Sequence, residues 1–354
     1  MNRRDYLAAL GTTGATGLAG CAGLLQSRSP YAPPVVEDRP DAVYYPSHVE
    51  GMAMIGTATT GRIGCALTYT YPHRFWLVTG TRTERVSIQP EDSIHLMPVV
   101  WDRETGIVLP DASPGVDVTA AGEVVASINP WAMLSQPMGM HFGDNVQLPG
   151  DGGYTFDVGV ASPSLPRLGG MAAAPTGGAT CSFDFEYSRA ARNDLSLRRF
   201  PDRKGTRGAV EPMTMEAMPT SQVPAPDALP GRHLGSGTTG DAKFVATALD
   251  DASAYGGTAD QSYLAVSPRT PYNRHMLPAM GLTATVTRGA ETRYDGPLTA
   301  AVAPDLSVHY GAVIGDVRPG DDLVIGVRLP PQVARHEGYE TAFLAMGSVS
   351  LRVG

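Results

Sequence analysis

The chain has 354 residues and a formal net charge of -8 at pH 7, because 35 acidic side chains face 27 basic ones. This acidic balance argues against nucleic acid as a partner, since nucleic-acid binding requires a basic surface. The length is sufficient for two domains. After the N-terminal residues, no stretch approaches the roughly 18 uncharged apolar residues of a membrane-spanning helix.

The N-terminus has the features of an export signal. Paired Arg3 and Arg4 precede a weakly apolar run rich in Ala, Gly and Thr, which predicts a twin-arginine signal over residues 1–21. The run ends in LAGC, which resembles a lipobox, so we expect Cys21 to be acylated and to become the mature N-terminus. The alternatives are a signal cut before a small residue and a short anchor left uncut. A Pro-rich tether over residues 22–45 would hold the folded part away from the membrane.

From Gly51 onward the sequence predicts strands and turns. Short runs rich in Val, Ile, Thr and aromatic residues are separated by Gly, Pro, Asp and Asn, and none has a sustained helical period. This pattern predicts an all-β fold of antiparallel sandwiches. The first series of runs comprises RIGCALTYTY, RFWLVTG, ERVSIQP, SIHLMPVVWD, GVDVTAAG, EVVASINPW, GYTFDVGV and TCSFDFEYS. Within it, Cys65 and Cys181 either pair after export or remain buried thiols.

The strand series is interrupted once. Residues 191–240 are rich in Pro, Gly and polar residues without periodicity, so we interpret them as a linker between domains, with a long excursion as the alternative. It would separate a first domain, residues 46–190, from a second, residues 241–354. The first contains MHFGDNVQLPGDGGYTFDVGV around His141, and the second contains VHYGAVIGDVRPGDDLVIGVRL around His309. This long-period similarity predicts a duplicated domain, whereas the alternative is the turn-and-strand pattern that all sandwiches share.

The chemistry-bearing residues favour metal binding over catalysis. The chain lacks a Gly-x-Ser-x-Gly elbow, a phosphate loop and a dinucleotide fingerprint, so we expect no enzymatic activity. His95 and Met97 are two apart in a predicted strand and therefore share one face. A group of methionines, Met133 among them, precedes His141. Imidazole binds copper, iron and zinc, and thioether sulfur suits copper(I), although each methionine taken alone is an ordinary core residue.

These motifs resemble the bacterial periplasmic iron-transport family. The shared features are IHL, a methionine before the His-aromatic-Gly turn, a Pro-Gly hairpin and YTFDV. Members of that family are Ig-like sandwich lipoproteins of high-affinity iron uptake that bind copper or another transition metal. The resemblance covers most of residues 50–190 and, more faintly, residues 241–354. It implies two Ig-like antiparallel β-sandwich domains in this chain.

The resemblance also implies metal ligands in the first domain. His95 and His141 match two histidines of the family's site. Met97 stands where the family has Glu, and Met133 lies eight residues before His141 instead of seven. The family's last histidine has no counterpart here, where only Met171 lies nearby.

The second domain matches the same pattern less fully. It keeps His309 and an Arg-His pair that ends at His336, but it has Val302 at the methionine position and no Ile-His-Leu-Glu run. Neither domain therefore has a complete set of ligands. The second is either a structural partner, or the two domains share ligands across an interface.

Two other segments carry histidines for which we favour a structural role. His73, in YPHRFWLVTG, accompanies aromatic residues that fill the core or form a partner surface, and we favour the core. His48 and Glu50, in YYPSHVEGMAMIG, belong to an accessory metal site or to the entry strand of the sandwich, and we favour the strand.

We therefore expect an extracytoplasmic, lipid-anchored protein that binds a transition metal ion, iron or copper, and delivers it to a membrane permease. The expected partners are the membrane, through the lipid at Cys21, the permease, and a second copy of the chain in a homodimer. The rival hypothesis is a cell-surface structural or interaction lipoprotein whose metal site has decayed.

Overall fold

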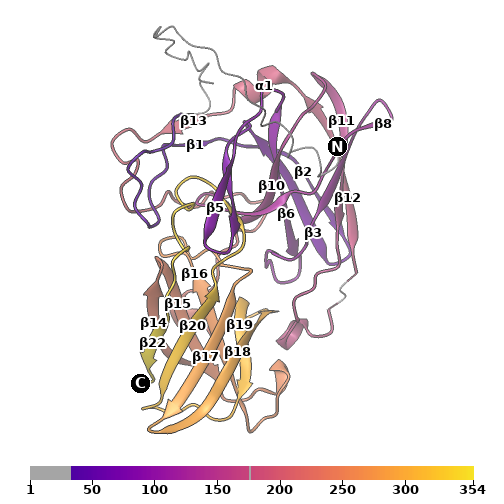
Figure 1. Cartoon of the computed structure of the whole chain (residues 1–354). Coiled ribbons are helices and arrows are strands. Elements are labelled where there is room, and N and C mark those ends of the chain that lie inside the picture. Colours follow the sequence, from indigo (N-terminus) through magenta and orange to yellow (C-terminus); the bar gives the residue numbers. More distant parts are fainter. Residues whose placement is uncertain (1–32, 175–176) are drawn as a thin grey trace, which may run out of the picture.

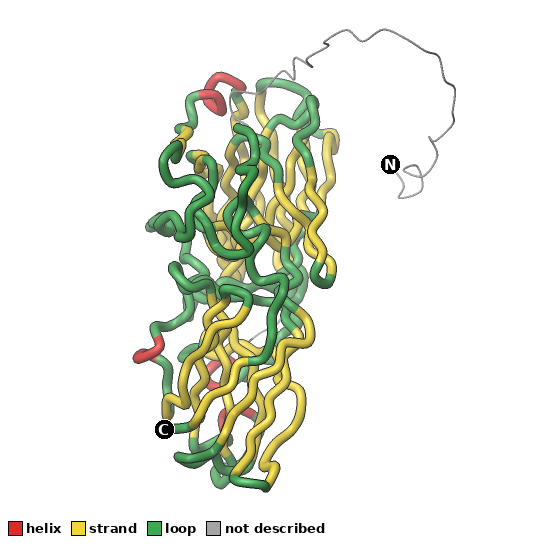
Figure 2. Tube along the Cα trace, turned by 60° about the vertical axis from the view of Figure 1, so that its left-hand side comes forward, coloured by secondary structure: helices red, strands yellow, loops and turns green. Residues whose placement is uncertain are grey.

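The structure of the chain, a computed structural model, describes residues 33–174 and 177–354. Within them the regular structure is almost entirely β-strand, which confirms the all-β prediction. Two β-sheet bodies are stacked end to end in an elongated molecule, the first built mainly from the indigo and magenta part of the chain (Figures 1 and 2). The predicted signal with its lipidation site Cys21, and residues 22–32 of the predicted tether, lie outside the described residues.

The first body is a sandwich of two sheets. In spatial order, its larger sheet contains β2 (Ala53–Thr60), β3 (Ile63–Thr70), β6 (Ile94–Asp102), β10 (Gly139–Val146), β9 (Trp131–Ser135), β21 (Ala334–Arg335), β4 (Phe75–Thr79) and β5 (Arg82–Val86). The smaller sheet contains β12 (Ala179–Tyr187), β11 (Gly152–Val160), β7 (Gly115–Ala120) and β8 (Glu123–Ile128). A separate two-stranded sheet pairs β1 (His48–Glu50) with β13 (Leu197–Arg199).

The second body is one strongly curved sheet. In spatial order, it contains β14 (Arg232–Thr239), β15 (Ala242–Leu249), β16 (Ser262–Arg269), β19 (Ser307–Ile314), β18 (Glu291–Ala303), β17 (Gly281–Arg288), β20 (Asp322–Leu329) and β22 (Val349–Arg352). Its first and last strands lie beside each other, so the sheet nearly closes on itself (Figure 1).

Helices are few and short in the described residues. They are α1 (Arg189–Asn193) and the 3-10 turns η1 (Gly169–Met171), η2 (Pro226–Ala228) and η3 (Ser253–Tyr255). None has the length and apolarity that crossing a membrane would require.

The alternation of side chains explains how the strands lie in the sandwich. In β7, Val116 and Val118 are buried while Asp117 between them is exposed, as expected for a strand with one face on the core and one in solvent. All eight residues of β3 are buried, because this strand lies between β2 and β6 and is covered on both faces. Cys65 of β3 and Cys181 of β12 are buried free thiols.

The first part of the predicted linker packs against the first body, whereas its last residues form β14 of the second body. The backbone N–H of Tyr45 donates to the carbonyl of Thr206 (2.9 Å), and that of Gly208 donates to the carbonyl of Val43 (3.2 Å). The segment thereby covers the chain that leads into β1.

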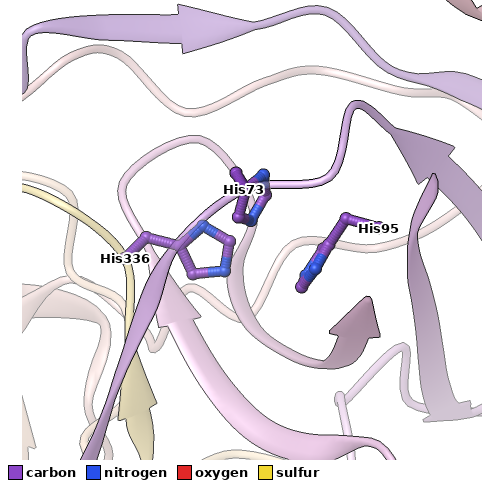
Figure 3. A group of neighbouring side chains, drawn as sticks. All are labelled: His73, His95 and His336. Carbon is purple, nitrogen blue, oxygen red and sulfur yellow. The ribbon is translucent and has the colours of Figure 1, made fainter. Parts of the chain in front are cut away.

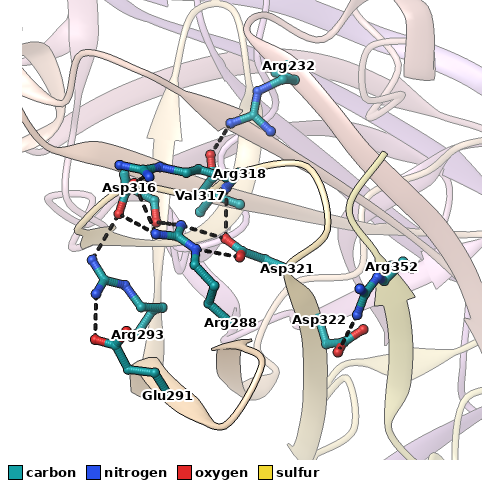
Figure 4. A network of polar contacts seen from close by, with 10 residues as sticks. All are labelled: Arg232, Arg288, Glu291, Arg293, Asp316, Val317, Arg318, Asp321, Asp322 and Arg352. Carbon is teal, nitrogen blue, oxygen red and sulfur yellow. Dashed lines mark hydrogen bonds and ion pairs between the residues drawn. The ribbon is translucent and has the colours of Figure 1, made fainter.

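An ion-pair network stiffens the turns at the far end of the second body (Figure 4). The Arg288 guanidinium lies between the carboxylates of Asp316 (3.3 Å) and Asp321 (2.8 Å). Arg293 bridges Asp316 (2.9 Å) and Glu291 (2.6 Å). Most of these groups are partly exposed, so each pair contributes little stability, and the network mainly fixes the turns.

The C-terminal part of the chain returns to the first body before it ends. After β20 it inserts β21 between β9 and β4, with Ala334 opposite Met133 in a parallel pairing and Arg335 opposite Trp76 in an antiparallel one. It then runs back to form β22. Residues of the predicted second domain therefore complete the larger sheet of the first body.

A buried arginine holds the returning segment in shape. Nη1 of Arg335 donates to the carbonyls of Tyr339 (3.3 Å) and Ala342, and Nη2 donates to that of Pro331 (3.0 Å). Burial lowers the pKa of Arg335 to about 9, so the guanidinium stays charged at neutral pH. One side chain thus satisfies three carbonyls of the loop around β21.

We expect Arg335→Met to lower the free energy of unfolding by about 3 kcal/mol, because it keeps the side-chain volume but leaves buried carbonyls without donors. Arg335→Lys keeps a charge but not the planar fork, so it should lose less. Urea denaturation of both variants measures the effect. A methionine variant as stable as the wild type would contradict the role given to this guanidinium.

Candidate metal centre

The strand register brings three of the predicted ligands to one face of the larger sheet. His141 of β10 lies opposite Met133 of β9, and Asn145 of β10 lies opposite His95 of β6. Residues 141, 143 and 145 share a face because side chains alternate along a strand. His95, Met133 and His141 therefore face the same space.

The inserted strand adds another imidazole to this face. His336 follows β21 directly, and its backbone N–H donates to the carbonyl of Leu134 in β9 (3.1 Å). Its ring centroid lies 5.1 Å from that of His141 and 5.7 Å from that of His95. A residue near the C-terminus is thus in contact with side chains of the N-terminal half.

A further imidazole comes from the loop that precedes β4. The ring of His73 stacks on that of His95 with centroids 3.9 Å apart and meets the ring of His336 at 4.6 Å. One ring nitrogen from each of these three residues lies within 4.8 Å of the others, as the converging rings in Figure 3 show. Ligands of one ion at about 2.1 Å per bond are separated by roughly 3.4 to 4.2 Å, so a small inward movement of the rings is sufficient for them to share an ion.

In His95 and His141, hydrogen bonds fix which ring nitrogen is available. Nδ1 of His95 donates to Oδ1 of Asn145 (2.9 Å), and Nδ1 of His141 donates to the carbonyl of Gly139 (3.0 Å). A neutral imidazole that donates through Nδ1 carries its lone pair on Nε2. Asn145 also accepts from the backbone N–H of His73 (3.2 Å) and donates to its carbonyl (3.0 Å), so it positions two rings.

The available nitrogens are buried and have no hydrogen-bond partner. They are Nε2 of His95, His141 and His336 and both ring nitrogens of His73. Buried polar atoms are nearly always paired, so several unpaired nitrogens aimed into one space indicate a bound group. Outer hydrogen bonds that orient the rings are typical of histidine metal ligands.

Gly143, which has no side chain, keeps open the space that these groups surround. A Cβ atom on Gly143 would lie 2.6 Å from Nε2 of His95 and 3.1 Å from Sδ of Met133. No side chain larger than hydrogen fits there without displacing both donors. The thioether of Met133, which is fully buried, therefore borders the same space as the imidazoles.

Burial keeps these imidazoles uncharged. It lowers the pKa of His95 to about 4 and that of His141 to about 3. The pKa values of His73 and His336 are lowered well below 6.5 by burial and then by the neighbouring imidazoles. All four imidazoles are neutral at pH 7, so each can bind a metal ion through a ring nitrogen without first losing a proton.

The second body contains a similar histidine, His309, but the ring nitrogen that would bind a metal already has a hydrogen-bond partner. Nδ1 of His309 donates to the carbonyl of Ser307 (3.0 Å), as His141 does to Gly139, but Nε2 of His309 accepts from the hydroxyl of Tyr263 (3.0 Å). Tyr263 lies opposite Val313 as His95 lies opposite Asn145.

The register also identifies the counterpart of the methionine. Ala301 lies opposite His309, so Ala301 and not Val302 occupies the position of Met133. The second body thus has tyrosine and alanine where the first has imidazole and thioether.

The structure groups the sequence-predicted ligands differently from the two sets expected. Four of the six converge at this centre: His95, Met133, His141 and His336. His309 lies in the other body and does not contact it. Met97, fully buried on β6, lines an adjacent pocket of about 60 Å³ together with Met138 and His336.

His73 was not among the predicted ligands. It lies in a loop, after Tyr-Pro, at no motif spacing from another ligand, and the hydrophobic run that follows it favoured a core assignment. Likewise, nothing in the sequence near His336 connects it with His95. Both residues reach the centre through pairings between distant strands.

The comparisons with known proteins give a limited likeness. A family model described as a domain of unknown function (DUF7350) matches residues 227–352. No curated protein matches the chain.

Solved structures match over a minor part of the chain. A copper-bound variant of FetP from uropathogenic Escherichia coli strain F11 is 15% identical with a TM-score of 0.29, covering 38% of this chain and 97% of that one. Another FetP structure from the same strain is 17% identical over 38% and 95%, with the same TM-score of 0.29. A copper-bound variant of P19 from Campylobacter jejuni is 14% identical over 39% and 98%, with a TM-score of 0.29. Similarity at this level leaves the function to be argued from the residues of this chain.

We expect Gly143→Ala to weaken metal binding on the order of 10- to 100-fold, because the added methyl group displaces His95 and Met133. Competition with a chromophoric chelator measures the affinity. Gly159→Ala is the matched control, since a Cβ there meets only a carbonyl oxygen at 3.9 Å. Equal affinities for Gly143→Ala and the control would contradict the assigned space.

We expect the metal-free protein to lose stability as the pH falls from about 6.5 towards 4. In this range unfolded histidines take up protons, whereas His95 and His141, with pKa values of about 4 and 3, remain neutral in the fold. Urea unfolding at pH 7.5 and pH 5 measures the change. His95→Gln/His141→Gln lacks both groups, so its stability should fall less. An identical fall in both proteins would contradict the buried, neutral state.

Proposed function

We propose that this chain is an extracytoplasmic transition-metal-binding protein, anchored by a lipid at Cys21, that delivers its ion to a membrane permease. The metal ion is the cargo, and His73, His95, His141 and His336 with Met133 are its ligands. The observation that carries this proposal is the set of buried imidazole nitrogens that converge without any hydrogen-bond partner.

The chemistry of the donors favours copper over iron. The inner group consists of neutral imidazoles and a thioether, a combination that suits copper, whereas iron(II) sites usually include a carboxylate. The carboxylate expected at position 97 by resemblance is a methionine, which shifts the preference further in the same direction. Iron, the other ion expected from the sequence, remains the comparison in any titration.

The geometry suits binding and release better than chemistry on a substrate. The donors are held by a rigid sheet and need no deprotonation, so an ion can enter or leave without large rearrangement. The export and delivery parts of the proposal are supported by the N-terminal sequence and by the family resemblance of the first domain.

The rival hypothesis, a structural lipoprotein with a decayed site, describes the second body better than the first. There the nitrogen of His309 that would bind a metal is occupied by the Tyr263 hydroxyl. If the centre in the first body had lost its function, we would expect hydrogen-bond partners on its ring nitrogens as well, and these nitrogens have none.

Titration of the purified mature protein with Cu(I), Cu(II), Fe(II) and Zn(II) tests the proposal. We expect at least one copper equivalent to bind more tightly than micromolar, and His95→Ala/His141→Ala to weaken this binding by more than about 100-fold, because it removes two ligands from opposite sides of the space.

His309→Gln is the control for this titration. It removes a histidine from the equivalent place in the second body and should leave copper binding unchanged. Indifference of the wild-type protein to every ion, or equal binding by the double variant, would overturn the proposed function.

A further inference from the structure

A second group of metal-binding side chains lies beside the candidate metal centre. His48 and Glu50 are two apart in β1 and point to the same side of the strand. Nε2 of His48 lies 2.8 Å from Oε1 of Glu50, and Nδ1 of His73 lies 3.8 Å from that same oxygen. The carboxylate is thus placed between two imidazoles, one of which also belongs to the centre.

Among the described residues, the ion-pair partners of the Glu50 carboxylate are imidazoles, and no lysine or arginine pairs with it. Its side chain is only 16% exposed. The nearby carboxylate of Glu337, by contrast, lies 2.6 Å from the guanidinium of Arg74. A carboxylate that pairs only with imidazoles can bind a metal ion together with them once an imidazole proton is displaced.

His73 supplies an independent indication that a ligand belongs here. Its residue is 7% exposed, and neither ring nitrogen has a hydrogen-bond partner. Two ligands that each lie about 2.1 Å from one ion are separated by roughly 3.4 to 4.2 Å. The 3.8 Å between Nδ1 of His73 and Oε1 of Glu50 falls in this range.

The same groups line the pocket that adjoins the centre. His48, Glu50 and His73 are among its polar lining residues, which also include the Arg74–Glu337 ion pair, and Met52, Met97 and Met138 are among its apolar residues. His336 also lines it, so the pocket connects the carboxylate with the imidazoles of the centre. An ion held at Glu50 would be adjacent to one held by the centre.

We propose that His48, Glu50 and His73 form an outer site for a divalent transition-metal ion, next to the inner centre and sharing His73 with it. This inference rests on the proposed function, because the inner centre is taken to bind copper. Two imidazoles and one carboxylate with open positions suit iron(II) and its harder divalent neighbours, whereas the inner imidazoles and thioether suit copper. Binding at the outer site replaces the hydrogen bond between Nε2 of His48 and Glu50. The neutral imidazole then carries its proton on Nδ1, 2.8 Å from Oγ of Ser47, and Nε2 is free to act as a ligand.

The shared imidazole makes the two sites interdependent. Nδ1 of His73 faces Glu50, while the ring stacks on His95 of the inner centre. Three other imidazoles and Met133 remain for the inner ion when His73 serves the outer one. The inner centre can therefore be filled first and the outer site examined separately.

Anaerobic titration with Co(II), a spectroscopic probe for divalent ions, tests the outer site in protein already loaded with one equivalent of Cu(I). We expect the loaded wild type to bind one equivalent of Co(II) with the absorption bands of a low-symmetry nitrogen and oxygen site. Glu50→Gln and His48→Gln should each weaken Co(II) binding at least about 10-fold while Cu(I) affinity stays within about threefold of the wild type.

Glu84→Gln, at an exposed carboxylate of β5, is the matched control and should bind both ions like the wild type. Copper-loaded wild type that takes up no Co(II), or Glu50→Gln that binds it unchanged, would overturn the outer site alone. Failure of the wild type to bind Cu(I) would instead overturn the proposed function. A thermal melt of each variant establishes that a loss of Co(II) binding does not arise from unfolding.

Discussion

The insertion of β21 between β9 and β4 is the pairing on which the candidate metal centre depends. It joins Met133 of β9 and the loop of His73 before β4 into one continuous sheet, and it brings His336 to the same place. The strand is only two residues long, so its position relies on Arg335 and on the carbonyls that this guanidinium satisfies. The site is therefore a property of the whole described chain and not of one sheet.

Electrostatics and packing both keep the centre able to receive a metal ion. Burial suppresses protonation of the imidazoles, and backbone or amide acceptors hold their Nδ1 protons, so the lone pairs face inward. Gly143 leaves the central volume open at the position where any other residue would fill it. The second body shows what happens when one of these conditions changes, because Tyr263 pairs with the nitrogen of His309 and the space closes.

The sequence was informative where the relevant contacts are local. The β-class follows from short apolar runs and turn residues, and His95, Met133 and His141 follow from motifs on neighbouring strands. His336 was expected in a set with His309, with ligands shared between the domains as the alternative, and it lies beside His73 and His95. Its partner strands lie some two hundred residues earlier, and no pattern in one sequence specifies that pairing. His73 was missed because a loop residue has no periodicity. The duplication and the domain limits stay predictions. The matching register around His141 and His309 agrees with a duplication, whereas β14 begins inside the predicted linker and β21 pairs outside the predicted second domain.

The route of β21 also limits how the molecule can be divided. The β4–β5 hairpin pairs with the rest of its sheet only through this strand. A fragment ending before the second body would leave the hairpin unattached and expose the unpaired backbone edges of β4 and β9, which favours aggregation. The first body is consequently not an autonomous module, because its larger sheet is complete only when the C-terminal part of the chain is present.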